Sequence, residues 1–236
     1  MAARTVVSVW AGMSRTSAAL CLPALLFLCG AGAAPAIADG HCRIADTAPY
    51  DIDVEARIPG SIAVDQRFSR SQLGAATAHG GRGRVLGLMR GQLDVRSSNS
   101  FGYVEADSGY CFWLQEVKIV LEFPLVEIYV AREYRPGSCA YRAILDHEED
   151  HLRVARNILD PYAAEMRSAL TSLGIPKPNA PWFVDDLEAA KAKAQDLLGR
   201  LLNPIYRRMQ AEMANRQAQL DSRQEYREVY RRCDSW

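Results

Sequence analysis

The sequence predicts an α+β protein whose first half forms strands and whose second half forms helices. Residues 50–58 alternate between polar and apolar side chains, and residues 85–132 are rich in β-branched and aromatic side chains, both typical of strands. From residue 138 onward, apolar residues recur every three or four positions, which indicates helices that bury one face. Strands followed by helices favour separate layers. We therefore expect a mostly antiparallel N-terminal sheet packed on the first long helix, followed by long C-terminal helices.

The first 38 residues have the three regions of a secretory signal peptide. Arg4 and Arg15 are their only charged residues, an apolar run over residues 18–32 follows, and Ala36-Ile37-Ala38 offers a small-x-small cleavage site. The alternative is an uncleaved membrane anchor, but the run is shorter than the roughly 20 residues that span a bilayer. We therefore expect an exported protein, periplasmic or extracellular, without stable membrane insertion once residues 1–38 are removed.

The mature chain, residues 39–236, is expected to form a single domain with strands over 39–137 and helices over 138–236. The formal net charge of the full chain is zero, which gives no electrostatic support for a nucleic-acid partner. Four cysteines remain after removal of the signal peptide, and in an exported protein they favour two disulfides. Three pairings are possible. We favour Cys111–Cys139, which would join the sheet to the first long helix, and Cys42–Cys233, which would join the two ends of the mature chain.

Turn residues delimit the predicted strands. A Ser-Ser-Asn-Ser turn at residues 97–100 separates two of them, and a Gly-rich loop covers residues 74–84. Pro124 lies at the bend between two strands that we expect to pair antiparallel, since proline cannot donate to a ladder. The predicted strands are residues 50–58, 85–95, 101–105, 111–123 and 125–132.

Two helical segments follow. Ser138 is a good N-cap for a helix that runs to about Asp160, where Pro161 breaks or kinks it before a further turn or two to Ser172. Residues 182–232 are predicted as a second helical segment with a kink at Pro204.

Residues 147–151, His-Glu-Glu-Asp-His, are the strongest chemical signal in the sequence. Helix positions four residues apart lie on the same face, so His147 and His151 can bind one metal ion. Zinc binds neutral imidazole nitrogens, and a catalytic zinc site leaves one coordination position for water. Glu148 would then act as the general base that takes a proton from this water. We therefore expect His147 and His151 as ligands of Zn²⁺ and Glu148 as the catalytic residue.

The apolar pattern around this motif supports a metal site. Both histidines belong to a helical row with Ala140, Ile144, Val154 and Ile158, which faces the core. Glu148 belongs to the adjoining row, at the edge of the buried face. A buried carboxylate is costly unless something binds it. The alternative, a chance pattern with hydrogen-bonded core histidines, is disfavoured because the mature chain has only four histidines.

The third ligand is less clearly marked. The metzincin continuation HExxHxxGxxH is absent, because Val154 and Asn157 occupy the glycine and last histidine positions. In gluzincins, whose HExxH motif this segment resembles, a glutamate from a later helix completes the site, and on ligand type we favour Glu225. Asp185, Asp186 and Glu188 have an alternative role, because acidic residues in the first turn of a helix complement its dipole. The other candidates are Asp160, Glu165, Asp185, Asp186, Glu188 and Asp221.

With this motif, the chain resembles zincin-like metallopeptidases of the gluzincin type. Residues 129–151 (YVAREYRPGSCAYRAILDHEEDH) are similar to a group of small secreted bacterial proteins that are regarded as zinc proteases. In that group a strand, a Gly-Ser-Cys segment and an HExxH helix come in this order. A looser similarity covers residues 220–233. The resemblance implies a zincin-like catalytic domain, a bound Zn²⁺ and hydrolysis of peptides or proteins.

Two other functions stay open at this stage. One is a periplasmic amidase that acts on cell-wall material, and the other is a non-catalytic binding or scaffold protein that retains the zincin helix. By the gluzincin analogy, residues 125–132 would be the edge strand that pairs with an extended substrate. Tyr206, Tyr226 and Tyr230 are candidates for a hydroxyl that stabilises an oxyanion.

Overall fold

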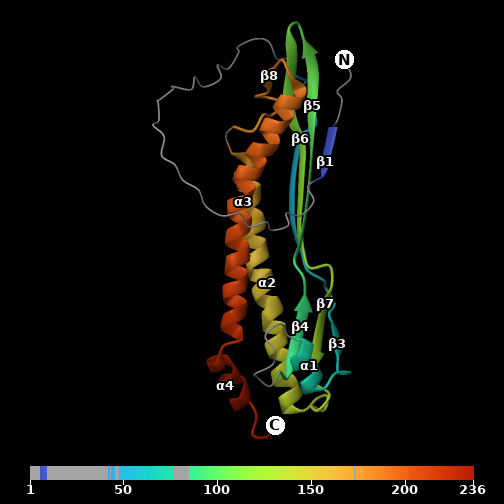
Figure 1. The fold of residues 1–236 in the computed structure, drawn as a ribbon, viewed down its shortest axis with the longest axis vertical. Coiled ribbons are helices and arrows are strands. Elements are labelled where there is room, and N and C mark those ends of the chain that lie inside the picture. Colours follow the sequence, from blue (N-terminus) through green and yellow to red (C-terminus); the bar gives the residue numbers. More distant parts are fainter. Residues whose placement is uncertain (1–5, 10–41, 43, 46–47, 77–84, 173) are drawn as a thin grey trace, which may run out of the picture. The chain divides into compact units, whose positions relative to one another are not determined.

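The fold is α+β, as the sequence predicts (Figure 1). The structure, a computed structural model, describes residues 6–9, 42, 44–45, 48–76, 85–172 and 174–236. The predicted signal peptide apart from residues 6–9, and residues 77–84 of the predicted Gly-rich loop, lie outside these residues. The elements are β1 (Val6–Val9), β2 (Asp51–Arg57), β3 (Ala63–Asp65), α1 (Arg70–Ala76), β4 (Gly87–Gly91), β5 (Asp94–Ala106), β6 (Gly109–Glu122), β7 (Val126–Val130), α2 (Cys139–Thr171), β8 (Trp182–Val184), α3 (Leu187–Leu220) and α4 (Arg223–Arg231).

The chain divides into two compact units, each assembled from segments that are far apart in sequence. The first unit comprises Met1–Asp51, Ser97–Val117 and Gly174–Gln195. Its strands pair antiparallel, β1 with β5 and β8 with β6, around buried aromatic residues such as Phe112 and Trp113. The predicted turn at residues 97–100 is wrong, because β5 runs through these residues without interruption. Asn99 and Ser100 are buried there, so sheet pairing outweighs their turn preference.

The second unit comprises Ile52–Arg96, Lys118–Leu173 and Asp196–Trp236, and it contains the predicted site. Its three-stranded sheet has the order β3-β7-β4, with β7 parallel to β3 and antiparallel to β4. The expected antiparallel pairing of the two strands on either side of Pro124 is therefore wrong, because β7 pairs with β3 and β4 instead. Nor can β7 be an edge strand that binds substrate, since both of its edges are occupied.

Helix α2 covers this small sheet through its first turns. One hydrophobic cluster joins α1, the strands β4 and β7, and the start of α2, and Ile128 of β7 and Ile144 of α2 are almost fully buried in it. The other buried members are Leu73, Leu86, Tyr129, Val130, Ala131, Tyr134 and Ala140. This cluster fixes the rotation of α2 about its axis, and so fixes which face carries the residues after Ile144.

Ser138 caps α2 as predicted, because its side chain accepts a hydrogen bond from the Tyr141 amide. Pro161 does not break the helix, which continues to Thr171, so the predicted continuation to Ser172 is confirmed to within one residue. The apolar face continues beyond the proline with Ala163, Met166 and Leu170, all buried. Burial of this face outweighs the backbone hydrogen bond that Pro161 cannot make.

Helix α3 runs antiparallel to α2 within the second unit, and side-chain contacts connect their residues in reverse order (Figure 1). The predicted segment over residues 182–232 is divided into three elements: the short strand β8, the helix α3 with Pro204 inside it, and the helix α4. Ser222 starts α4 by accepting a hydrogen bond from the Glu225 amide. The helical structure is therefore interrupted at Asp221 and Ser222, between α3 and α4.

Two disulfides are present, as expected, but the favoured pairing is wrong. Cys42 pairs with Cys111 and Cys139 pairs with Cys233. Cys111 belongs to the first unit and Cys139 to the second, so each bridge stays within one unit. The second bridge attaches the C-terminal end of α4 to the first residue of α2. Among the helices of the described residues, none combines the length and apolar character needed to cross a membrane.

Candidate metal centre

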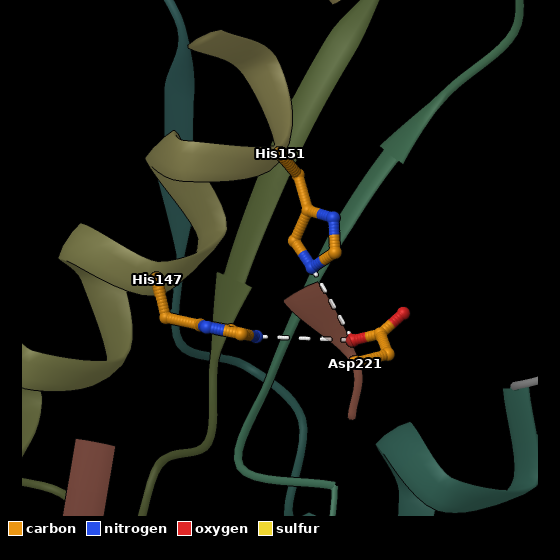
Figure 2. Close-up of side chains that lie close together, drawn as sticks. All are labelled: His147, His151 and Asp221. Carbon is orange, nitrogen blue, oxygen red and sulfur yellow. Dashed lines mark ion pairs between the residues drawn. The ribbon is translucent and has the colours of Figure 1, made fainter. Parts of the chain in front are cut away.

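Three side chains converge in the second unit, two from α2 and one from the break between α3 and α4. The Nε2 atoms of His147 and His151 lie 3.8 Å and 3.3 Å from Oδ1 of Asp221. Figure 2 shows both imidazoles, on successive turns of α2, directed at this one carboxylate oxygen. Potential ligand atoms of the three residues all lie within 4.8 Å of one another. Among the described residues they form a group that could hold a metal ion.

Two separations within this group are close to those expected around a zinc ion, without identifying the metal. Two ligand atoms at about 2.0–2.1 Å from a tetrahedral zinc ion are about 3.3 Å apart. The His151–Asp221 distance equals this separation, and the His147–Asp221 distance exceeds it by half an ångström. Nε2 of His147 is buried and has no hydrogen-bond partner. A buried polar atom without a partner is costly, and a metal ion at this position would remove that cost.

The group lies at the boundary between core and solvent. The His147 and His151 side chains are 4% and 9% exposed, whereas the Asp221 side chain is 53% exposed. An ion held here would therefore have protein on one side and an approach from solvent on the other. Access from solvent is one requirement of a metal site that binds an exogenous ligand.

Glu148 is buried beside the two histidines and is held by the edge of the small sheet. Its Oε2 accepts a hydrogen bond of 2.7 Å from the backbone amide of Met89 in β4. A Cβ atom on Gly87, two residues earlier in the strand, would lie only 2.6 Å from Oε1 of Glu148. Glycine therefore allows β4 to approach Glu148 and α2 closely. The predicted burial of Glu148 on the α2 face is confirmed.

Gln217, in the last turns of α3, binds His151 through both ends of its side-chain amide. Its Nε2 donates a 2.9 Å hydrogen bond to the backbone carbonyl of His151, and its Oε1 is hydrogen-bonded to Nδ1 of the ring. No motif in the sequence marks Gln217 as part of the site. Its position four residues before Asp221, one helical turn earlier, is the only sequence signal for it.

Tyr226 is the one of the three tyrosine candidates that contacts the group. Its hydroxyl donates to Oδ1 of Asp221 at 3.2 Å, and its ring centroid lies 5.3 Å from that of His147. Tyr206 instead accepts a hydrogen bond from Gln210, and Tyr230 packs against Trp236.

The preferred third ligand, Glu225, is not a member of the group, and its place is taken by the alternative Asp221. The reason is the helix break at residues 221–222. Ser222 and Glu225 form the start of α4, a Ser-x-x-Glu pattern typical of a helix N-terminus. This break orients Asp221 toward α2. The pattern was available in the sequence and predicts the break.

The remaining acidic candidates have other partners or positions. Glu165 pairs with Arg208 between α2 and α3. Asp186 accepts hydrogen bonds from the amides of Glu188 and Ala189 and so caps the start of α3, as acidic residues near a helix N-terminus commonly do. Asp160 is exposed on α2. His79 lies outside the described residues.

The ionisable groups of the site influence one another strongly. Burial raises the pKa of the Glu148 carboxyl, and the adjacent His151, His147 and Met89 amide offset only part of this rise. Burial would also raise the pKa of Asp221, but its contacts with the two histidines outweigh this and lower that pKa. Asp221 and Gln217 in turn raise the pKa of His151 against the opposing effect of burial. Burial and the Asp221 charge raise the pKa of Tyr226, which therefore remains a hydrogen-bond donor at neutral pH.

Comparison of the chain with protein-family models, curated proteins and solved structures found no match. The residues gathered at the site are therefore the basis for a functional proposal.

Proposed function

We propose that this protein is an exported zinc-dependent peptidase. The observation that carries the proposal is the convergence of His147, His151 and Asp221, with the buried Glu148 directly beside the two histidines. The two disulfides, which are typical of oxidising compartments, support export. Bound zinc would supply Lewis acidity toward a substrate carbonyl and toward water.

In this proposal the two oxygens of Glu148 have different tasks. Oε2 is committed to the Met89 amide, which fixes the orientation of the carboxylate. Oε1 would accept a proton from the attacking water and later pass it to the leaving amine, as general base and then general acid. Gly87 supports this orientation of the carboxylate, because any side chain at that position would collide with Oε1. The Tyr226 hydroxyl is placed to donate a hydrogen bond near the same centre.

The substrate would lie along β4 rather than β7. Among the described residues, β4 pairs only with β7 and so is an edge strand. The Ala131 amide donates to the Leu86 carbonyl, and the antiparallel register then directs the amides of Leu88 and Arg90 toward β7. Those of Met89 and Gly91 are directed away from it, and the first of these holds Glu148. The Met89 carbonyl and the backbone groups of Gly91 are therefore suited to pair with an extended peptide.

Amide hydrogen exchange tests this strand assignment. When a Glu148→Gln variant binds a peptide that it cannot cleave, exchange of the Gly91 amide should slow. The Leu88 amide, which already faces β7, serves as the internal control and should not change. Unaltered exchange at Gly91 in a complex of demonstrated affinity would eliminate β4 as the substrate strand.

The proposed chemistry is tested by metal content and turnover of the wild type and Glu148→Gln. The purified chain should contain one zinc per molecule and cleave casein or a fluorogenic peptide library. Glu148→Gln preserves the hydrogen-bonding shape of the side chain but removes its basicity. We expect it to retain zinc and to lose activity by roughly 10²–10⁴-fold, as is typical when a general base is removed.

Three outcomes would redirect the proposal. A wild type that binds zinc but releases peptide stems from purified peptidoglycan and not from proteins would favour the cell-wall amidase. Zinc binding without turnover on either substrate would favour the binding or scaffold function. A wild type that binds no zinc from a stoichiometric supply would eliminate the metal centre itself.

A further inference from the structure

The hydrogen bonds of Gln217 determine which nitrogen of His151 carries the proton. The carbonyl oxygen of His151 has no hydrogen to donate, so the Gln217 atom that faces it at 2.9 Å must be the amide nitrogen. The amide oxygen of Gln217 is then directed at Nδ1 of the ring. An amide oxygen can only accept, and Nδ1 must therefore be the donor. In a neutral imidazole this leaves Nε2 with a free lone pair.

The atom that is left free is the one directed at the metal centre. Nε2 of His151 lies 3.3 Å from Oδ1 of Asp221, whereas Nδ1 is on the Gln217 side of the ring. Histidine ligands of metals commonly donate their other N–H to a carboxylate, a backbone carbonyl or water, which fixes the ring and its tautomer. Here a neutral amide occupies that place. A third carboxylate beside Glu148 and Asp221 would add negative charge to a largely buried site, and an amide avoids this.

We propose that Gln217 is the positioning residue of this centre, which locks His151 in the Nδ1–H tautomer and so presents Nε2 to zinc. Gln217 does not bind the metal. It acts through His151. Because Gln217 precedes Asp221 by four residues, the last turn of α3 and the residue that follows it supply both the positioning residue and the third proposed ligand. The inference rests on the proposed zinc site, but the tautomer can also be measured without zinc, where Oδ1 of Asp221 competes with Gln217 as an acceptor for the ring proton.

The tautomer can be measured directly. The ¹⁵N chemical shifts of the His151 ring distinguish the two neutral tautomers from each other and from the doubly protonated ring, and they are recorded in the zinc-free protein at a pH high enough that the shifts show a neutral ring. We expect the Nδ1–H form in the wild type. Observation of the Nε2–H form would overturn the proposal, whether or not the protein binds zinc.

Two substitutions separate positioning from packing. Gln217→Leu keeps the approximate size of the side chain and removes both hydrogen bonds. Gln217→Glu keeps the acceptor for Nδ1 but turns an oxygen toward the His151 carbonyl. If Gln217 positions the ring, zinc affinity should fall by roughly 10–100-fold in Gln217→Leu. It should fall less in Gln217→Glu, which should also retain the Nδ1–H tautomer. A packing role predicts the reverse order, with leucine tolerated better than the partly buried charge.

Gln219→Leu, an exposed position on the same helix, is the matched control and should bind zinc like the wild type. Zinc affinity is measured by competition with a chromogenic chelator, and circular dichroism verifies that each variant is folded. Wild-type affinity in a folded Gln217→Leu protein, or a lower affinity in Gln217→Glu than in Gln217→Leu, would overturn the proposal. Absence of zinc from the wild type would instead refute the metal centre. The tautomer measurement would still decide whether Gln217 holds His151 in the Nδ1–H form.

Discussion

The metal centre draws on two regions of the chain that differ in how their geometry is determined. Helix α2 supplies His147, Glu148 and His151 from five consecutive residues, and all three are buried on one face. The junction of α3 and α4 supplies Asp221 from a point seventy residues after His151, and its side chain is half exposed. The first region depends on helical periodicity alone. The second depends on where one helix ends, where the next begins, and what holds them against α2.

This difference predicts that substitutions in α2 and at the junction of α3 and α4 affect the geometry of the metal centre differently. The spacing of the two imidazoles persists wherever α2 is helical, because positions four residues apart share a face. The position of Asp221 is not fixed by helical periodicity. Its position depends on the Ser222 cap, on the Gln217 contacts with His151 and on the disulfide between Cys139 and Cys233. Changes at the junction should therefore alter the affinity of the centre without abolishing the histidine pair.

The largest effect at the junction is expected from Asp221 itself. Asp221→Asn keeps the size of the side chain and the acceptor for Tyr226 but removes the charge that binds the metal. We expect zinc affinity to fall by more than the roughly 10–100-fold that is typical of losing an outer-shell partner. Glu225→Gln is the matched comparison, because glutamine also suits this position of a capping box. It should leave zinc affinity within a few-fold of the wild type.

Chelator competition on both variants decides between the two candidate ligands, with His147→Ala as the reference for a lost ligand. An unchanged affinity in Asp221→Asn together with a large loss in Glu225→Gln would restore the ligand that the sequence favoured. That result would mean that the junction adopts a different arrangement when zinc is bound.

The parts of the site that follow from local rules were predictable from sequence. The Ser138 cap, the buried row of α2, the two histidines and the burial of Glu148 all depend on contacts within one helix or on its register. Asp221 could be named only as one of several acids, because choosing it requires the break at Ser222. A Ser-x-x-Glu pattern marks that break, but the continuous apolar and charged pattern of residues 187–232 favours a single helix.

The fold shows the same division. The α+β class and most strands follow from patterns within short windows of sequence. Strand partners do not, since β7 pairs with β3 and β4 instead of its neighbour β6. The cysteine pairing also depends on tertiary structure, because it requires knowing which segments share a unit. Pro161 lies inside α2 because burial beyond it outweighs a local penalty that sequence rules weigh heavily.

A smaller effect on the metal centre is expected from removing the disulfide of the second unit. Cys139 is the first residue of α2, and Cys233 follows α4 by two residues. The bridge closes a separation of 94 residues, and its loss should lower the free energy of unfolding by about 2–5 kcal/mol. In the folded protein, α4 and the preceding Asp221 would then be less restrained. We expect Cys139→Ser/Cys233→Ser to weaken zinc binding by less than tenfold, well short of Asp221→Asn.

The disulfide of the first unit is the control for this prediction. Cys42→Ser/Cys111→Ser removes a bridge of comparable separation, 69 residues, so its cost in stability should be similar. It constrains no residue of the metal centre, and zinc affinity measured below the unfolding temperature should match the wild type. Equal losses of affinity in the two double variants would mean that zinc binding follows global stability. A loss confined to the Cys139–Cys233 variant would assign it to the restraint on α4, because the two bridges differ in which segments they join rather than in the length of chain they close.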